Sequence, residues 1–372
     1  MKFRCERDDL LEAVQFASRA ISNRATLPVL SGLRIEAVDS GEVVVAATDL
    51  ELTMQTAFQA GVDDPGQVIV PGRLFGEMTR NLGVGGVSLA SGEGEVEIGS
   101  GRGQFRVKTL AAEDYPALPA DDAGGTGIEV EIEPGALATA LSQVLRAATA
   151  DESRPILTGV LWEIEDGAVT LAATDSYRLG VRTLEVRGGT PETRRVVLPA
   201  RALSELVRAV QGGGERVKGI VADNLMSFEV STEARDLRVG TRFIEGEFPN
   251  YRQLLPKGHP NSLTTGRDEF LEVVRRVGLL AQNNLPVKLH IDDELEISAH
   301  TPDVGEGQEM LEADCRGEPL VIAFNPSFLS DGLSAVQQAR VVLEALDGLK
   351  PATIRGEGDD SFTYLLMPVR LS

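Results

Sequence analysis

One pattern of segments occurs three times along the chain, and this repeat constrains the fold more than any other sequence feature. Two copies contain Ala46-Ala47-Thr48-Asp49-Leu50-Glu51-Leu52 and Ala172-Ala173-Thr174-Asp175-Ser176-Tyr177-Arg178-Leu179, which lie 126 positions apart. In the third copy, Ile297-Ser298-Ala299-His300-Thr301 takes the corresponding place. A period of this length indicates one folding unit used several times, so the repeat decides the architecture.

A helix with one apolar face is predicted at the start of each copy. Apolar residues recur there at i, i+4, i+7 and i+11, which places them on one side of a helix. The three sets are Leu10, Val14, Ala17 and Ile21; Leu137, Leu141, Val144 and Ala148; and Phe270, Val274, Val277 and Ala281. A second helix is predicted near the middle of each copy, beginning after Pro71, Pro199 and Ala323.

The rest of each copy consists of short alternating runs that predict strands. Most of these runs are joined by short turns, which favours antiparallel pairing. Gly-rich or Pro-rich boundary signals lie at 121–127 and 256–260. We therefore expect an α+β fold of three repeated domains, at residues 1–125, 126–257 and 258–372.

The formal net charge of −21 argues naively against a nucleic-acid partner. It does not say where the 36 Lys and Arg residues lie, however, so a locally basic surface remains open. No apolar run approaches the roughly 20 residues of a membrane span, and the start lacks the apolar core of a secretory signal. Cys5 and Cys315 form no metal or redox spacing. We expect a cytoplasmic protein that has no membrane partner, metal or cofactor.

The chain resembles the bacterial sliding clamps, the β subunits of the replicative DNA polymerase, from end to end. Any one matching motif would be weak, but all of them occur in order on a threefold repeat. The motifs are Met1-Lys2-Phe3, Arg24-Ala25-Thr26-Leu27-Pro28, Thr174-Asp175 with Arg178-Leu179, Phe248-Pro249-Asn250-Tyr251 and Met367-Pro368-Val369-Arg370-Leu371.

The resemblance implies three clamp domains per chain, with helices lining the inside and antiparallel sheets outside. Two chains would join head to tail into a homodimeric ring around double-stranded DNA. Such a protein is a processivity factor rather than an enzyme. Its implied partners are the polymerase α subunit, an ATP-driven clamp loader and other replication and repair proteins. A sliding ring must attract phosphates without reading bases.

Three groups of site residues follow from the resemblance. The implied DNA-binding positions are Arg24, Arg73, Asp151, Pro155 and Ile156, the last three replacing polar or aromatic residues of some relatives. The implied peptide-binding cleft comprises Leu157, Thr174, Ser176, Tyr177, Arg178, Leu179, Pro249, Gln253, Leu254, Leu365, Met367, Pro368, Val369, Arg370 and Leu371. The implied dimer interface comprises Phe105 and Val107 on an edge strand, and Leu279 and Leu280 on a helix.

This chain departs from the family's pattern at several cleft positions. Ser176 and Tyr177 stand where relatives commonly have glycine and histidine, and Gln253 stands where some have arginine. Partner preference is therefore expected to differ from that of relatives.

Two other functions are compatible with parts of the sequence. Asp49 and Asp175 could be catalytic carboxylates, but their equivalent places in separate repeats suit carboxylates that bond nearby backbone amides in a turn. A repeat scaffold that binds proteins but never DNA would share the cleft and lack a basic lining. The alternative to the cleft and interface assignments is plain core packing of the same apolar residues.

Overall fold

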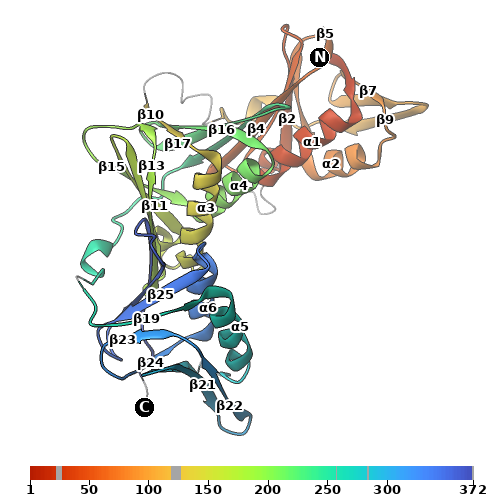
Figure 1. Cartoon of the computed structure of the whole chain (residues 1–372). Helices are drawn as coiled ribbons and strands as arrows, with labels where there is room; N and C mark the ends of the chain where they lie inside the picture. Colours follow the sequence, from red (N-terminus) through yellow and green to blue (C-terminus); the bar gives the residue numbers. More distant parts are fainter. Residues whose placement is uncertain (22–26, 119–126, 257, 283–284, 371–372) are drawn as a thin grey trace. The chain divides into compact units, whose positions relative to one another are not determined.

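The computed structural model describes residues 1–21, 27–118, 127–256, 258–282 and 285–370. Its elements follow one another in the same order three times (Figure 1). Within these residues each repeat has nine strands and two α-helices. Every strand pair is antiparallel, so the predicted α+β fold of three repeats with antiparallel sheets is confirmed.

The first repeat comprises β1 Lys2–Glu6, α1 Arg7–Ala17, β2 Gly32–Ala37, β3 Glu42–Thr48, β4 Leu52–Gln59, β5 Gly61–Asp64, β6 Gly66–Pro71, α2 Gly72–Asn81, β7 Gly86–Ser91, β8 Glu95–Ser100 and β9 Gly103–Lys108. The second comprises β10 Ile128–Ile132, α3 Pro134–Val144, β11 Gly159–Glu165, β12 Ala168–Thr174, β13 Arg178–Glu185, β14 Arg187–Gly188, β15 Arg194–Pro199, α4 Ala200–Gln211, β16 Gly214–Val221, β17 Leu225–Thr232 and β18 Asp236–Arg242. The third comprises β19 Asn261–Gly266, α5 Arg267–Gly278, β20 Val287–Ile291, β21 Leu295–Thr301, β22 Gly305–Leu311, β23 Asp314–Arg316, β24 Leu320–Phe324, α6 Pro326–Ala335, β25 Arg340–Ala345, β26 Ala352–Gly356 and β27 Phe362–Leu366.

Short 3₁₀ helices replace the ends of several predicted elements, including the second predicted helix, where Leu145–Ala147 follows α3. The first predicted helix stops at Ala17, and a 3₁₀ turn, Ser18–Ala20, follows it. Ile21, expected on the apolar helix face, lies beyond both. The predicted strand at residues 27–35 begins as the 3₁₀ helix Pro28–Ser31, and its counterpart is Pro155–Thr158. Proline fixes φ near the helical value and has no N–H to donate to a ladder, which explains the change at Pro28 and Pro155.

Each repeat splits its strands between two sheets. In the first repeat these have the orders β5-β1-β7-β8-β9 and β6-β2-β3-β4. The ninth strand of one repeat then pairs with the fourth strand of the repeat before it. β18 joins β4, and β27 joins β13, so two nine-stranded sheets run through the repeat boundaries.

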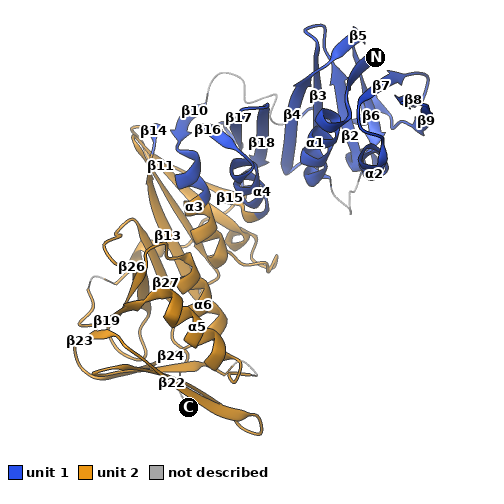
Figure 2. Cartoon of the chain, turned by 45° about the vertical axis from the view of Figure 1, so that its right-hand side comes forward, with its two compact units in different colours: residues 1–138, 186–189, 201–243 blue, residues 139–185, 190–200, 244–372 orange. Residues whose placement is uncertain are grey.

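The chain forms two compact units, which Figure 2 shows in blue and orange. The first contains residues 1–138, 186–189 and 201–243, and the second contains residues 139–185, 190–200 and 244–372. Each nine-stranded sheet lies within one unit. The second repeat contributes one sheet to each unit.

Apolar helix faces and sheet faces form the core within each repeat. α1 packs beside α2, and α5 packs beside α6. The predicted helix residues Leu10, Leu137 and Phe270 are all fully buried, as is Trp162 on β11. Burial of such side chains supplies the main favourable term in folding.

Candidate functional site

The turn between β12 and β13 is shaped by two side chains of the repeated motif. Asp175 Oδ1 accepts hydrogen bonds from the backbone N–H groups of Tyr177 and Arg178, at 2.9 and 3.0 Å. Thr174 Oγ1 donates to the Arg178 carbonyl at 2.6 Å and accepts from the Ser176 N–H at 3.1 Å. The predicted turn-forming role of Asp175 is confirmed.

The first repeat contains the same turn. Asp49 Oδ1 accepts from the N–H groups of Glu51 and Leu52, at 3.1 and 2.8 Å. Leu50 and Ser176 occupy equivalent places, and both have φ of 81°. This left-handed conformation is unfavourable for residues with a Cβ, so the turn is enforced by its side-chain hydrogen bonds.

Arg178 is the most constrained side chain of the site. Its Nε donates to Asp175 Oδ2 at 2.9 Å, and its Nη1 donates to the Asp331 carboxylate and, at 3.4 Å, to the Tyr364 hydroxyl. The guanidinium also lies 4.4 Å from the centroid of the Phe328 ring. Burial alone would lower the pKa of Arg178, but these partners outweigh burial and raise it. The cation is therefore permanent.

Close packing of α6 on β27 brings these partners to Arg178. A Cβ at Gly332 would lie 2.6 Å from the Tyr364 ring, so only glycine permits this approach. Asp331 and Phe328 lie on the same helix, and Tyr364 belongs to β27.

A second arginine holds the outer side of the turn. Arg154 Nη2 donates to the Asp175 carbonyl at 3.0 Å and to Ser176 Oγ at 2.8 Å. Tyr177, largely exposed, stacks against Phe328 with ring centroids 6.4 Å apart. The Phe328 ring therefore contacts both the half-buried guanidinium and the exposed Tyr177 ring.

The segment after β27 lies against the same turn. The Met367 N–H donates to the Tyr177 carbonyl at 2.9 Å, and the Val369 N–H donates to the Ala323 carbonyl at 2.8 Å. Strand pairing thus ends before Pro368, as expected, but Val369 is bonded to β24 rather than free. Met367 and Arg370 are exposed, and Leu371 lies outside the described residues.

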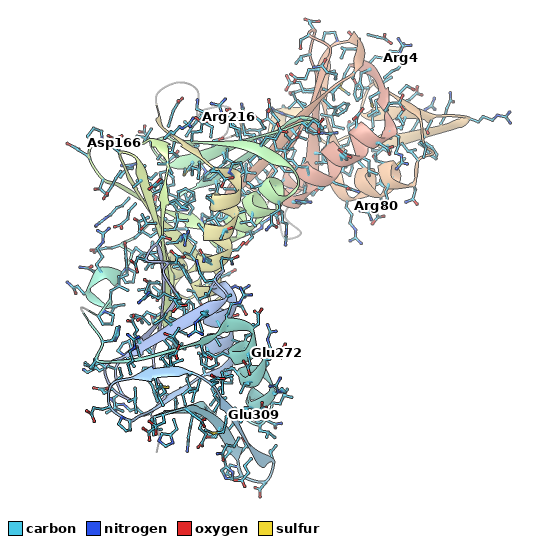
Figure 3. All side chains as sticks on the ribbon, in the orientation of Figure 1. Arg4, Arg80, Asp166, Arg216, Glu272 and Glu309 are labelled. Carbon is cyan, nitrogen blue, oxygen red and sulfur yellow. The ribbon has the colours of Figure 1, made fainter. Side chains whose placement is uncertain are left out.

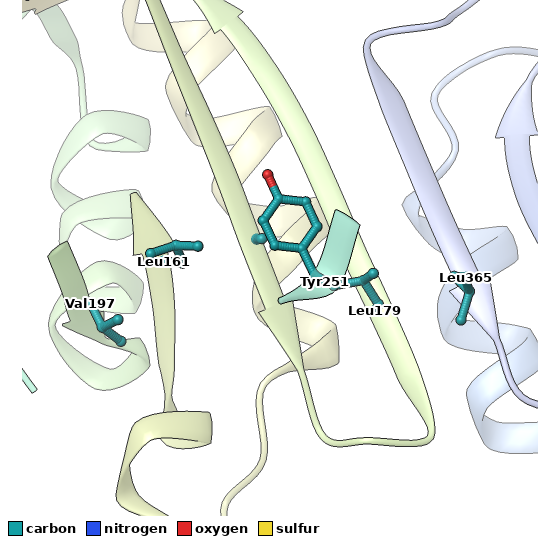
Figure 4. Packing of buried hydrophobic residues seen from close by; sticks show 6 residues of the cluster. Leu161, Leu179, Val197, Tyr251 and Leu365 are labelled. Atoms are coloured by element: carbon teal, nitrogen blue, oxygen red, sulfur yellow. The ribbon is translucent and has the colours of Figure 1, made fainter. Parts of the chain in front are cut away.

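The remaining apolar cleft residues divide between floor and rim. Leu179 and Leu365 are buried in one cluster with Leu161, Ala172, Val197 and Tyr251 (Figure 4). Leu157 is also buried, so these positions form a floor that is part of the core. Pro249, Gln253 and Leu254 are exposed on the segment around the 3₁₀ helix Tyr251–Gln253.

The structure thus joins Thr174, Ser176, Tyr177, Arg178 and Met367 by hydrogen bonds. It adds five residues that the motif comparison missed, namely Arg154, Phe328, Asp331, Tyr364 and Tyr251. Their contacts cross between elements far apart in the chain, which no local pattern signals. Tyr251 alone stood within a quoted motif.

Three arginines line a groove between α1 and α2. The groove walls include Arg19, Arg73 and Arg80, with Gly72 and Gly76 on the α2 side. Arg73 is 90% exposed in its side chain and lies 3.4 Å from Glu77. Figure 3 shows Arg80 near the end of α2. The expected residue Arg24 lies outside the described residues.

The implied DNA-binding positions of the second repeat have other contacts. Asp151 Oδ1 accepts from the Ser153 N–H at 2.9 Å, and the hydrogen bonds from Ser153 lower the pKa of Asp151. Pro155 is exposed at the start of its 3₁₀ helix. Ile156 packs against the buried cluster of Leu161 and Tyr251. These three positions present no cation to a phosphate.

The four implied interface residues differ in exposure. Phe105 is 43% exposed on β9, whereas Val107 on the same strand is 4% exposed and faces the core. Leu279 is 73% exposed. Leu280 is half-buried, because its side chain packs against Gly307 of β22. The packing is so close that a Cβ at Gly307 would lie 2.7 Å from the Leu280 side chain.

The described part of the chain contains no group of three or more His, Cys, Asp or Glu side chains placed to hold a metal ion. No helix within the described ranges is both long and apolar enough to cross a membrane. Asp49 and Asp175, the two candidate catalytic carboxylates, both accept hydrogen bonds from backbone amides and pair with an arginine.

Comparison with known proteins gives matches along the whole chain. Family models for the N-terminal, central and C-terminal domains of the DNA polymerase III beta subunit match residues 1–119, 131–250 and 252–370. The chain is 35% identical over 382 residues to the beta sliding clamp of Streptomyces coelicolor, with 100% of both proteins covered. It is 31% identical over 386 residues to that of Staphylococcus aureus, with 100% of this chain and 99% of the relative covered.

The solved structures give the same result. The crystal structure of the DNA polymerase sliding clamp from Bacillus subtilis matches with a TM-score of 0.92, 28% identity and 100% of each chain covered. The beta subunit from Thermotoga maritima matches with a TM-score of 0.90 at 26% identity, again over 100% of each chain. The chain therefore belongs to the family of DNA polymerase III beta subunits, the beta sliding clamps, which are non-catalytic processivity factors of the replicative polymerase.

Proposed function

We propose that two copies of this chain close head to tail into a ring around duplex DNA, which tethers the polymerase α subunit and other DNA-handling proteins in the cytoplasm. One observation carries the proposal. Among the described strands, β9 and β22 lack the neighbour that the repeat provides for their counterparts.

The repeat rule identifies the missing neighbours. The ninth strand of a repeat pairs with the fourth strand of the repeat before it, as β18 does with β4 and β27 with β13. β9 is the ninth strand of the first repeat, and β22 is the fourth strand of the third. The rule therefore pairs β9 of one copy with β22 of another. We call this pairing the seam.

The equivalent residues also give the register of the seam. The Leu110 N–H donates to the Ile69 carbonyl as the Ile244 N–H does to the Val197 carbonyl, which aligns β9 with β18. The pairs Thr48↔Thr53 and His300↔Glu306 align β4 with β22. Transferring the β4–β18 pairs then places Gly305 opposite Val107, Glu306 opposite Arg106, and Gly307 opposite Phe105. Opposite charges and an aromatic ring over glycine suit such a pairing.

The helices at the repeat boundaries support the same assignment. Arg19 lies 3.6 Å from Glu205, and the equivalent pair Arg146 and Asp331 is 3.4 Å apart. The corresponding positions for the seam are Leu279 and Glu77. We propose that Leu279 and Phe105 supply the apolar contact between copies, while Leu280 and Val107 support them from within each core. An exposed apolar edge would otherwise be a hazard.

We propose that the helices of the three domains, with boundaries near residues 125 and 257, face the DNA. Arg19, Arg73 and Arg80 would attract phosphates from the groove between α1 and α2, and Arg24 would add to them. Phosphate contacts carry no sequence information. The ring would therefore slide along the duplex. Contacts to base edges would instead hold it at particular sequences.

We further propose that the site around Arg178 and Met367 binds short apolar peptides of these partners and of a clamp loader. Its apolar floor, exposed thioether and exposed aromatic ring suit repacking around varied ligands. A peptide of the form Gln-Leu-x-Leu-Phe should bind. Met367→Ala, or deletion of residues 368–372, should weaken binding, and Met310→Ala is a matched exposed control outside the site. Unchanged affinity in both cleft variants would remove the assignment.

A retention assay tests the ring. The chain is loaded with clamp loader and ATP onto nicked circular plasmid, and half of the sample is then linearised and separated by gel filtration. A closed ring stays with circles and slides off ends at moderate salt. Equal retention on both forms would indicate ordinary surface binding, and no retention on either would favour a scaffold that binds only proteins.

A further inference from the structure

We infer that Glu163, which lies outside the cleft, is a positioning residue that holds one wall of the cleft in place. The wall is the segment of residues 249–254, which carries Pro249, Gln253 and Leu254. The inference rests on the proposed peptide-binding function and deepens it.

Glu163 is a buried carboxylate with three donors around it. It is 2% exposed on β11. The Tyr251 hydroxyl donates to its Oε2 at 2.5 Å, and Arg252 Nη2 donates to the same oxygen at 2.6 Å. Arg195 Nε, on the neighbouring strand β15, lies 2.9 Å from Oε1. We call these four side chains the Glu163 clasp.

Two of the donors belong to the wall itself. Tyr251 and Arg252 precede Gln253 and Leu254 directly, and the Leu254 N–H donates to the Tyr251 carbonyl at 2.9 Å. Burial and the bond to Glu163 raise the pKa of Tyr251, so its hydroxyl remains a donor. The clasp therefore fixes the backbone from which the exposed rim residues project.

The Tyr251 ring also reaches the cleft floor. It is buried in the same cluster as Leu179 and Leu365, two floor residues from different repeats (Figure 4). One side chain thus touches the floor with its ring and the clasp with its hydroxyl. Displacing the wall would remove two of the three donors from the buried Glu163 carboxylate. Leaving a buried charge without its partners strongly destabilises a protein, so the clasp favours the position of the wall seen here.

Among the residues that the structure describes, the equivalent strand positions of the other two repeats have different neighbours. Glu36 of β2 faces Gln67 in register and lies 3.6 Å from Arg34 of its own strand. In the third repeat the position is His290, which faces Val321. The clasp is therefore found in the repeat whose following segment forms the cleft wall, as a positioning role requires.

The test compares Glu163→Gln with Glu36→Gln, a matched variant at the equivalent strand position. Binding of a Gln-Leu-x-Leu-Phe peptide is measured with amide hydrogen exchange over residues 249–255. Glu163→Gln and Tyr251→Phe should each weaken the peptide by about tenfold, and the double variant should be no weaker than the worse single one. Exchange over 249–255 should rise, while dimer affinity stays that of the wild type.

Trp162, the only tryptophan, lies next to Glu163 on the opposite face of β11 and reports core integrity. If Glu163→Gln shifts the Trp162 fluorescence emission, the core has changed in that variant. The comparison with Glu36→Gln is then made with Tyr251→Phe, which removes only one hydroxyl group. Three results would overturn the inference and leave the cleft assignment intact. They are wild-type peptide affinity in both single variants, additive losses of affinity in the double variant, and an equal loss of affinity in Glu36→Gln. Failure of the wild-type chain to bind the peptide would overturn the cleft assignment and the inference with it.

Discussion

At the scale of single residues, the site depends on a turn whose conformation its own side chains enforce. Thr174 and Asp175 hold Ser176 at a φ of 81°. This strained turn positions Arg178, whose guanidinium forms ion pairs with both Asp175 and Asp331. The sequence predicted the role of Asp175 because a carboxylate two residues before a free amide bonds it locally. It did not predict Asp331, which lies 153 positions after Arg178 in the chain.

The left-handed residue gives a stability prediction. Ser176→Gly should stabilise the chain by about 0.5 to 1 kcal/mol, because glycine adopts positive φ without a Cβ clash. Chemical denaturation monitored by Trp162 fluorescence measures this change. Ser176→Ala serves as the control, since it removes the hydroxyl bonded by Arg154 and keeps the Cβ. Equal stabilisation by alanine would contradict the backbone explanation.

At the scale of elements, pairing across repeat boundaries matters more than any single helix or strand. Periodicity located the helices at Leu10, Leu137 and Phe270 because an amphipathic face is written locally in sequence. It missed the 3₁₀ helices that begin at Pro28 and Pro155. It also could not indicate that β18 joins β4, because that pairing brings together residues 180 or more positions apart. The resemblance to the family indicated the cleft residues. It did not indicate the Glu163 clasp, because Glu163 bonds residues 88 and 89 positions away in the chain.

The seam gives a prediction at this scale. Arg106→Glu or Glu306→Arg places like charges opposite each other and should weaken the dimer by about threefold to tenfold. The double exchange restores opposite charges and should recover most of the affinity. Analytical ultracentrifugation at low salt measures it, with Arg216→Glu as an exposed control on a strand inside a sheet. Failure of the double exchange to recover any affinity would argue for a different register.

At the scale of the whole molecule, the distribution of charge matters more than its total. The net charge of −21 would keep DNA away from most of the surface. The groove between α1 and α2 nevertheless concentrates Arg19, Arg73 and Arg80, with Glu77 beside Arg73 and Glu205 beside Arg19. A protein can therefore be acidic overall and still present a basic face to a phosphate backbone.

This distribution predicts how DNA binding depends on salt. Arg73→Ala and Arg80→Ala should weaken DNA binding uniformly across sequences, and each should reduce the salt slope by about 1. Fluorescence anisotropy with two duplexes of unrelated sequence, across a salt series, measures both effects. Arg216→Ala, on β16 outside the groove, should leave the slope unchanged. A loss confined to one duplex would instead indicate base readout.

The continuity of each sheet across the repeat boundaries has a consequence for the origin of the fold. A lone module of this design would leave the outer edges of its fourth and ninth strands unpaired, with backbone donors and acceptors open to any other strand. Such a module could satisfy both edges only by joining copies of itself in a closed circle. Covalent linkage of three modules closes two of these boundaries within one chain, β4 with β18 and β13 with β27, and leaves β9 and β22 as the two edges for a second copy.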